Sequence, residues 1–196
     1  MSQAPLKIGV IIGSVRTGRF ADTVANWAVA QLEQRDELAV EVIDLAAPEI
    51  VEELKLNLDP LTDVAPGRRT LAERPGALDG YVLITPEYNH GYPASLKLAI
   101  DYVYDGWRAK PVSFVSYGGV GGGLRSVEQL RQVFAELHAV TVRDVVSFHN
   151  APALFDDSGA PLDAKAVGQA ATVLVDNLVW WGLTLREGRE RRAYPA

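Results

Sequence analysis

The fold is decided by the stretch Lys7-Ile-Gly-Val-Ile-Ile-Gly-Ser-Val-Arg-Thr-Gly-Arg-Phe20. It opens with an apolar run, Ile8 to Ile12, in which β-branched residues predominate. The run breaks at Gly13 and Ser14, and apolar residues recur at helical spacing after Phe20. An apolar β-branched run predicts a buried strand and the later spacing predicts a helix, so we expect a strand, a tight loop and a helix in succession.

A loop between a strand and the start of a helix is suited to binding an anion. Glycine lets backbone N–H groups point inward, and the helix presents its positive dipole end and its unpaired N–H donors to the loop. Ser14 adds a hydroxyl donor, while Arg16 and Arg19 add positive charges that match a phosphate dianion. We therefore predict a bound phosphate ester. The alternative is a glycine-rich turn whose arginines are solvated.

Two common nucleotide motifs are incomplete in this loop. Gly13 and Gly18 have the spacing of a P-loop, but Arg19-Phe20 follows where a nucleotide hydrolase has Lys and then Ser or Thr. Ser14-Val15-Arg16 stands where the dinucleotide fingerprint has its second glycine, although Asp44 could act as a ribose-binding acid. A mononucleotide with one terminal phosphate fits this pattern.

Composition excludes several classes of protein. The 196 residues, 48% hydrophobic and 22% charged, suit one domain over residues 1–196, and a net charge of -6 argues against nucleic-acid binding. No cysteine is present, so disulfides and thiolate chemistry are excluded, and His90, His138 and His149 stand too far apart for a metal cluster. The chain shows no signal peptide and no apolar run of about 18 residues. We expect a cytoplasmic protein that binds neither membranes nor a metal.

Apolar spacing along the rest of the chain predicts alternating helices and strands. We expect helices at 20–35, 68–75, 94–104, 127–137 and 163–185, and strands at 38–45, 80–85, 111–117 and 140–146. Residues 46–67 are expected to be irregular and 186–196 to be a mobile tail. The alternation indicates an α/β fold with helices on both faces of a parallel sheet.

Three loops with unusual chemistry follow strands, at 13–20, 86–93 and 117–123. In parallel sheets of this kind, ligands bind beyond the carboxyl ends of the strands, at the point where the strand order reverses. We therefore expect the three loops to converge on one site.

The second loop, Pro86-Glu-Tyr-Asn-His-Gly-Tyr-Pro93, lies between two prolines. Because proline fixes φ, we expect a rigid, extended loop whose backbone groups face sideways. Such a loop suits a flat heteroaromatic ring with a donor and acceptor edge, such as a flavin, and the glycines of 118–123 let the backbone approach that ring. Inward N–H groups would stabilise the negative charge of a reduced flavin without a dedicated catalytic residue.

Three groups of residues give the chain its resemblance to a known family. They are Gly13-Ser-Val-Arg-Thr-Gly-Arg-Phe20; Pro86-Glu-Tyr-Asn-His-Gly91 with Ser95-Leu-Lys97 and Ala99-Ile-Asp101-Tyr102; and Ser116-Tyr-Gly-Gly119 with Gly122-Gly-Leu-Arg125 and Gln129-Leu-Arg131. From about residue 6 to 150 the chain resembles the NADPH-dependent FMN reductase family of flavodoxin-like proteins. The resemblance implies a three-layer flavodoxin-like fold with a five-stranded parallel sheet of strand order 2-1-3-4-5.

The same resemblance implies an FMN site at the three loops. The implied phosphate contacts are Ser14, Arg16, Arg19 and the backbone near Gly18 and Phe20. The implied contacts to the isoalloxazine ring are Pro86, Glu87, Tyr88, Asn89, His90, Ser116, Tyr117, Gly118, Gly119 and Gly122. Expected on the substrate side are Gly91, Tyr92 and Arg125, although Arg125 could instead only pair with Glu128.

Members of this family reduce quinones, azo compounds, chromate or free flavin with NADPH or NADH, commonly as dimers or tetramers. We therefore expect hydride transfer from NADPH or NADH through bound FMN to a small-molecule acceptor, by a ping-pong mechanism, in a homodimer or homotetramer. The aromatic residues of 101–107 are expected at the subunit interface. Leu98 departs from the family pattern, since we expect Asn there in relatives.

Two other functions remain open from the sequence. One is a flavodoxin-type electron carrier, which binds FMN but does not turn over NAD(P)H. Such carriers tend to be shorter and more acidic, with a Ser/Thr-rich phosphate loop, so Arg16, Arg19 and the glycine-rich third loop favour the reductase. The other is a flavin-free module that binds a mononucleotide or has a regulatory role.

Overall fold

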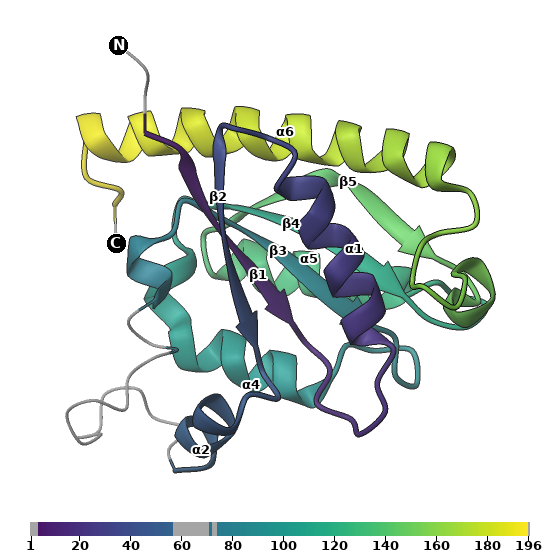
Figure 1. The fold of residues 1–196 in the computed structure, drawn as a ribbon. Coiled ribbons are helices and arrows are strands. Elements are labelled where there is room, and N and C mark those ends of the chain that lie inside the picture. The colour runs from purple at the N-terminus through teal and green to yellow at the C-terminus, as the bar shows by residue number, and fades with distance from the viewer. Residues whose placement is uncertain (1–3, 57–70, 72–73, 196) are drawn as a thin grey trace.

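The computed structural model describes residues 4–56, 71 and 74–195. At its centre is a sheet of five parallel strands in the order β2-β1-β3-β4-β5 (Figure 1), which confirms the predicted order. Strands β1, β3 and β4 are buried almost throughout, as expected for strands covered on both faces. The strands are β1 (Leu6–Ile12), β2 (Leu38–Asp44), β3 (Gly80–Pro86), β4 (Pro111–Tyr117) and β5 (Val140–Phe148).

Helices cover both faces of this sheet (Figure 1), so the predicted three-layer α/β fold is confirmed. α1 and α6 pack on one face, whereas α4, α5 and the short α2 pack on the other. In the part of the chain that the structure describes, no helix combines the length and the apolar character needed to cross a membrane. The helices are α1 (Ala21–Leu32), α2 (Pro48–Leu56), α4 (Ala94–Val103), α5 (Leu124–Glu136) and α6 (Ala164–Arg191).

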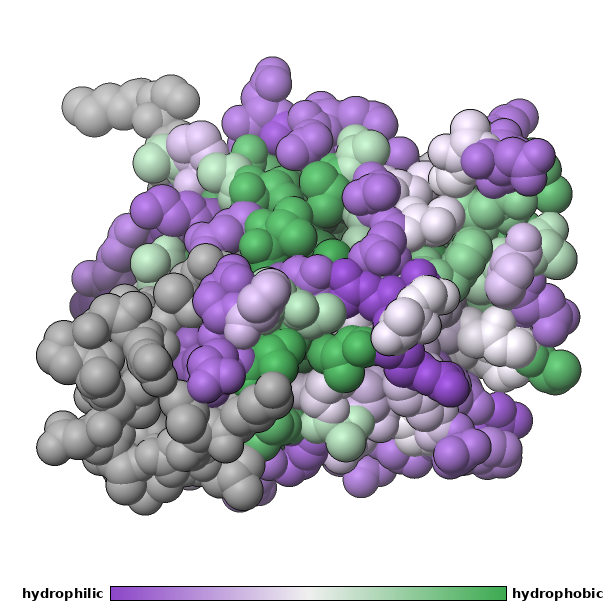
Figure 2. Space-filling model, turned by 60° about the horizontal axis from the view of Figure 1, so that its bottom comes forward, coloured by the Kyte–Doolittle hydropathy of each residue, from purple (hydrophilic) through white to green (hydrophobic). Residues whose placement is uncertain are grey.

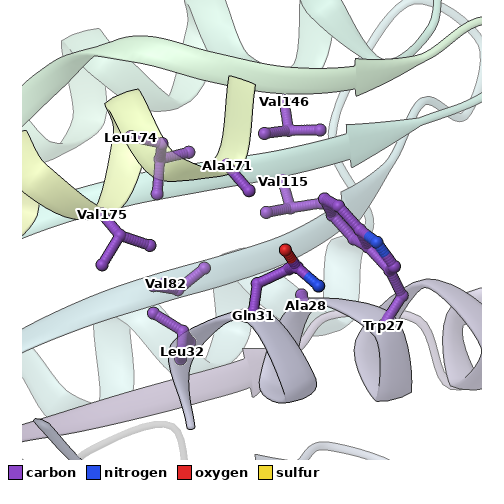
Figure 3. A pocket seen from close by; sticks show the side chains of 10 residues that line it. All are labelled: Trp27, Ala28, Gln31, Leu32, Val82, Val115, Val146, Ala171, Leu174 and Val175. Atoms are coloured by element: carbon purple, nitrogen blue, oxygen red, sulfur yellow. The ribbon is translucent and has the colours of Figure 1, made fainter. Parts of the chain in front are cut away.

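The layer between α1, α6 and the sheet is packed core. A cavity of about 10 Å³ remains there (Figure 3). A space of this size holds at most about one water molecule, and apolar side chains make up most of its wall. This layer therefore offers no ligand site. The lining residues are Trp27, Ala28, Gln31, Leu32, Val82, Val115, Val146, Ala171, Leu174 and Val175.

Two aromatic residues that were predicted at a subunit interface lie in the core on the other face. Tyr102 and Trp107 are 2% and 1% exposed. The Trp107 ring lies between Tyr81 and Phe134, with centroid distances of 4.5 and 5.2 Å. The interface prediction is wrong for Tyr102 and Trp107, because their rings complete the apolar layer between the sheet, α4 and α5.

Helix α2 corrects the prediction that residues 46–67 are irregular. The helix begins with Pro48 in its first turn, where proline is favoured, and its apolar positions Ile50 and Leu54 reach the core. Prolines and acidic residues around it conceal this short pattern in the sequence. Residues 57–67 lie outside the described residues, as does most of the helix predicted at 68–75, while a 3-10 turn occupies Arg74–Ala77.

Residues 186–191 are helical, so both the predicted end of the last helix at 185 and the mobile tail are wrong for them. Arg186 and Arg189 reach the carboxylate of Asp79, with N···O distances of 3.6 and 3.1 Å. Arg189 also donates to the Ala109 carbonyl at 2.6 Å. These contacts hold the end of α6 across the amino-terminal edge of the sheet, where β3 and β4 begin.

We predict that Asp79→Ala lowers the free energy of unfolding by about 1–3 kcal/mol. Two largely buried guanidinium groups would lose their ion-pair partner, although each keeps a backbone carbonyl, and the Lys7 N–H would lose its side-chain acceptor. Urea unfolding followed by circular dichroism measures the change. The matched control is Asp105→Ala, since Asp105 is 72% exposed in its pair with Arg108, and it should change stability by less than about 0.5 kcal/mol. Equal, small changes in both variants would show that Asp79 does not anchor α6.

Candidate functional site

The three loops that were predicted to converge lie together where the strand arrows end in Figure 1. β3 lies between β1 and β4, so the loops that follow these strands are neighbours. Ser14 Oγ of the first loop is 2.6 Å from Tyr88 Oη of the second. The Glu87 N–H of the second loop donates to the Tyr117 carbonyl, where the third loop begins, at 3.2 Å. The predicted convergence is confirmed.

The first loop, residues 13–20, is anchored to β3 and α4 and leaves one side open. Gly13 N donates to the Ile84 carbonyl at 2.9 Å, and Ser95 Oγ donates to the Gly13 carbonyl at 2.7 Å. Gly18 has a φ of 65°, and a Cβ at this position would meet nothing within 4 Å. Within the described residues, no side chain caps the start of α1 directly after the loop. Free helix N–H donors beside an open loop suit an anion.

Arg19 is held inside the protein by five hydrogen bonds. Nη1 and Nη2 donate to the two carboxylate oxygens of Asp44 at 2.7 and 2.6 Å. Nε and Nη2 donate to Asp22 at 3.0 and 2.6 Å, and Nη1 also donates to the Ser14 carbonyl at 2.6 Å. These bonds use all five N–H groups of a guanidinium. Because these donors already have acceptors, a direct phosphate contact from Arg19 would require an existing bond to break, and the contact predicted for Arg19 stays a prediction.

The Arg19–Asp44 pair changes the pKa of both groups. Hydrogen bonding to Asp44 is the main reason that the pKa of Arg19 lies above its ordinary value. Burial alone would raise the pKa of Asp44, but hydrogen bonds from Arg19 and from the Ala46 N–H outweigh burial and hold it below its usual range. Both side chains are therefore charged near neutral pH, and Asp44 is occupied rather than free to bind a ribose.

Arg16, by contrast, is exposed beside the loop. Its guanidinium carbon lies 4.9 Å from the centre of the Tyr88 ring, a cation–π contact that leaves its N–H groups able to donate elsewhere. Together with the open backbone at Gly18, Arg16 gives this loop accessible donors for a phosphate, while the buried Ser14 hydroxyl is paired with Tyr88 Oη.

The second loop is a tight hairpin turn, so the extended loop predicted for residues 86–93 is wrong. Tyr88 and Gly91 exchange two backbone hydrogen bonds of 2.8 and 3.0 Å. Asn89 and His90 between them have φ values of 50° and 69°. Both residue types enter the left-handed region more readily than most, and a two-residue turn of this hand needs it twice. Pro86 and Pro93 therefore lie on either side of the turn and do not make the segment between them extended.

The third loop is shaped by left-handed glycines. Gly122 and Gly123 have φ values of 58° and 84°. Ser116 Oγ and Ser147 Oγ each donate to the Gly122 carbonyl at 2.8 Å, which fixes the loop from beneath. At Gly119, in contrast, a Cβ would meet nothing within 4 Å. This open backbone is the kind of surface that a flat ring can approach closely.

A charged pair links the second loop to the third. Arg125 Nη1 donates to Glu87 Oε1 at 2.6 Å, and the Arg125 N–H points to Glu87 Oε2 at 3.4 Å. The Glu87 side chain is only 9% exposed, whereas Arg125 is 48% exposed. The predicted pairing of Arg125 with Glu128 is wrong, since Glu128 lies 3.4 Å from Arg131 instead. Glu87 therefore holds the start of α5 against the second loop.

The predicted contact residues fall into three groups at this edge. The buried ones support the loops, and burial raises the pKa of the Tyr117 phenol; they are Ser14, Pro86, Ser116, Tyr117 and Gly122. The exposed ones are Arg16, Gly18, Asn89, His90, Gly119 and Arg125. Those of intermediate exposure are Arg19, Phe20, Glu87, Tyr88, Gly91, Tyr92 and Gly118.

Two hollows border the loops. One, of about 370 Å³, lies beside the second and third loops and is lined by His90, Leu124, Arg125, Glu128 and Gln129. The other, of about 220 Å³, lies beside the first loop, and Leu98 lines it with Val15, Leu45, Val51, Leu54 and Ser95. Figure 2 looks onto the end of the molecule that carries α2 and α4, where apolar residues in green adjoin the grey atoms. Leu98, which stands where we expect Asn in relatives, thus helps to line an apolar hollow.

Sequence reasoning missed three residues that shape the first loop: Asp22, Asp44 as an ion-pair partner, and Ser95. A signal existed for Asp44, which ends β2. β2 is the neighbour of β1, so its carboxyl end had to lie beside the loop at 13–20. Asp22 stands three residues after Arg19, a spacing that brings side chains together in a first helical turn.

Comparison with known proteins gives an independent view of the chain. The model of the family described as NADPH-dependent FMN reductase matches residues 6–153. The NAD(P)H-dependent FMN reductase C4B3.06c of Schizosaccharomyces pombe is 39% identical over 120 residues, which cover 60% of each chain. The NAD(P)H-dependent FMN reductase LOT6 of Saccharomyces cerevisiae is 37% identical over 142 residues, covering 65% of this chain and 73% of that protein.

The fold also matches that of a solved flavodoxin. The structure of a mutant flavodoxin from Pseudomonas aeruginosa aligns with a TM-score of 0.55 and 16% identity, covering 87% of this chain and 99% of the flavodoxin. A likeness at this identity concerns the fold alone. It confirms the flavodoxin-like fold that the sequence resemblance implies.

We predict unequal stability effects for alanine substitutions at two glycines of the third loop. Gly123→Ala should lower the free energy of unfolding by about 1–3 kcal/mol, because Gly123 has a φ of 84° and a Cβ would lie 2.7 Å from Ser116 Cβ. Gly119→Ala should change it by less than about 0.5 kcal/mol, because its new Cβ meets open space. Thermal and urea unfolding measure both. A Gly123→Ala protein as stable as the parent would refute the described loop geometry.

Proposed function

Because this chain belongs to the NADPH-dependent FMN reductase family, we propose that it is an FMN-dependent NAD(P)H oxidoreductase whose flavin binds at the three loops. The observation that carries the proposal is that the matched residues 6–153 include all three loops, which lie at one edge of the sheet. The donor set and the open backbone at that edge fit a ligand with a phosphate at one end and a flat ring at the other.

In this proposal the first loop holds the FMN phosphate. Arg16, the Ser14 hydroxyl, and backbone N–H groups from Gly18 to Phe20 supply the contacts, and the uncapped start of α1 adds its dipole. Arg19 is left out of the direct contacts, since its five donors are occupied. The sequence-based assignment is kept for the other residues.

The second and third loops hold the isoalloxazine ring. The turn at Asn89 and His90 and the open backbone at Gly119 border the ring position, while Glu87 and Arg125 keep the two loops at a fixed separation. When bound, FMN supplies the redox chemistry, accepting a hydride and passing electrons on. The chain's own groups orient the ring and surround its edge with backbone donors, and no side chain has to act as a nucleophile or base.

The donor and the acceptor are small molecules in this proposal. NADPH or NADH reaches the ring beside the hollow of about 370 Å³ that His90 and Arg125 line. Gly91 and Tyr92, which follow His90 in the second loop, are kept as substrate-side residues. The acceptor classes are quinones, azo compounds, flavins and metal oxyanions such as chromate. Because donor and acceptor use one open face in turn, ping-pong kinetics with parallel initial-velocity lines are expected.

A homodimer or homotetramer is part of the proposal. α6 presents Val173, 48% exposed, and Trp180, 59% exposed, on its outer surface. Tyr104, which is 55% exposed, keeps the role at an interface that the buried Tyr102 and Trp107 lose. Apolar groups of this kind on a surface suit contact with another subunit.

The alternative is an electron carrier, because flavodoxins share the fold. One experiment separates the two functions. The purified protein is titrated with FMN while its visible spectrum is recorded, and NADPH is then added without oxygen. We expect a flavin spectrum that bleaches with NADPH and recovers with a quinone, together with rapid NADPH oxidation in turnover. Flavin binding without bleaching would indicate a carrier, and a protein that binds no FMN would contradict both.

We predict that Arg16→Ala weakens FMN binding by about 1–3 kcal/mol through the loss of a charge-assisted contact. Flavin fluorescence titration measures the dissociation constant. Arg143→Ala is the control, because Arg143 is 91% exposed and pairs only with the adjacent Asp144 among the ion pairs of the described residues. Unchanged FMN affinity in Arg16→Ala would remove Arg16 from the phosphate site.

A further inference from the structure

We infer that Arg19 and Asp44 are positioning residues: their ion pair fixes the shape of the phosphate loop, and Arg19 does not itself bind the phosphate. The inference rests on the proposed function, since it concerns the FMN phosphate. It also replaces the direct role that the sequence suggests for Arg19.

Every donor of the Arg19 guanidinium is already used in a hydrogen bond within the protein. Its side chain is 10% exposed, and it joins three elements of the chain. These are the end of β2 through Asp44, the first turn of α1 through Asp22, and the loop itself through the Ser14 carbonyl. A guanidinium with all of its donors satisfied is a structural brace, because a sixth partner would require an existing bond to break.

Arg19 also sets the direction of the peptide between Ser14 and Val15. Nη1 of Arg19 holds the Ser14 carbonyl oxygen at 2.6 Å. The peptide between Ser14 and Val15 is trans, since the described residues include no cis peptide bond. In a trans peptide the N–H points away from the preceding carbonyl. Arg19 therefore draws the carbonyl toward itself and turns the Val15 N–H to the opposite side, which removes an acceptor from the anion site.

The charges of Asp22 and Asp44 oppose the binding of an anion. Asp22 and Asp44 are two carboxylates at the edge of a loop that is proposed to bind a dianion, and both would repel it. Their contacts with Arg19 neutralise part of that charge. Asp44 must therefore contribute through the geometry it imposes, because its own charge opposes phosphate binding.

The direction in which Asp44→Asn changes FMN affinity distinguishes the two roles of Arg19. If Arg19 bound the phosphate directly, the substitution would remove a negative charge and release a guanidinium, so FMN would bind equally well or more tightly. If Asp44 positions Arg19, and Arg19 positions the loop, the same substitution must weaken FMN binding. Charge and geometry thus predict opposite results for one variant.

The experiment compares FMN with riboflavin, which has the same ring and no phosphate. Fluorescence titration of both flavins is carried out with the parent protein, Arg19→Ala, Asp44→Asn and Asp44→Glu. We expect Arg19→Ala and Asp44→Asn to lose about tenfold or more in FMN affinity, the equivalent of about 1.4 kcal/mol. Riboflavin affinity should stay within about twofold of the parent, and Asp44→Glu should recover part of the FMN affinity.

Arg35→Ala is the matched control. Arg35 lies just beyond the other end of α1 and also pairs with two carboxylates, those of Glu37 and Asp176, at 2.6 Å. Its loss costs the same kind of ion pair away from the loop, so the ratio of FMN to riboflavin affinity should not change. Unchanged riboflavin binding in each variant also shows that the ring site is folded.

The outcomes separate the inference from the proposed function. If the parent protein binds FMN but Asp44→Asn binds it as tightly or more tightly, the positioning role is overturned and the proposed function stands. Equal losses of FMN and riboflavin in Arg19→Ala and Asp44→Asn would also overturn it, because the effect would then be general. A parent protein that binds no FMN contradicts both.

Discussion

The pairing of β3 with β1 on one side and β4 on the other is the constraint on which the site depends. Both pairs are parallel, with Ile84 beside Ile12 and Pro86 beside Tyr117. Parallel pairing brings the carboxyl ends of all three strands to one edge. The loops that follow begin after Ile12, Pro86 and Tyr117, far apart along the chain, yet parallel pairing is enough to bring them together.

Charged pairs then set the distances between these loops. Arg19 and Asp44 connect the first loop to β2, and Glu87 and Arg125 connect the second loop to the third. Each pair includes one side chain that is at most 10% exposed, where water screens charge less than at the surface. Arg16 has a different place, over the ring of Tyr88, and stays accessible. In the proposed function, Arg19 and Arg125 thus hold the loops in place, and Arg16 is the cation left to bind the phosphate.

The sequence predicts most of this fold because its signals are local. Apolar runs and helical spacing locate the five strands and four of the helices, and the loops that follow the strands identify the edge. What the sequence does not show depends on contacts between distant residues. Asp79 extends α6 by pairing with Arg186 and Arg189 across more than 100 positions, and Asp44 claims Arg19 from another strand. Neither contact can be predicted from the spacing of neighbouring residues.

The prediction of an extended second loop is wrong for a different reason. Two prolines suggest an extended segment, but their fixed φ angles act only at positions 86 and 93, and Asn89 and His90 between them turn left-handed. Helix α2 was missed because nine residues with a proline and several acids give little periodicity. In both places a strong local signal, proline, concealed a weaker one.

The placement of α6 has a consequence for how the molecule is made. Gly182 packs against Leu6, so the last helix of the described chain covers the first strand. During synthesis the amino-terminal part leaves the ribosome first, at about 5–20 residues per second. The part of β1 that packs against α6 lacks this partner until α6 itself has emerged. Throughout that interval the nascent polypeptide presents an apolar surface, which makes it a candidate for chaperone binding.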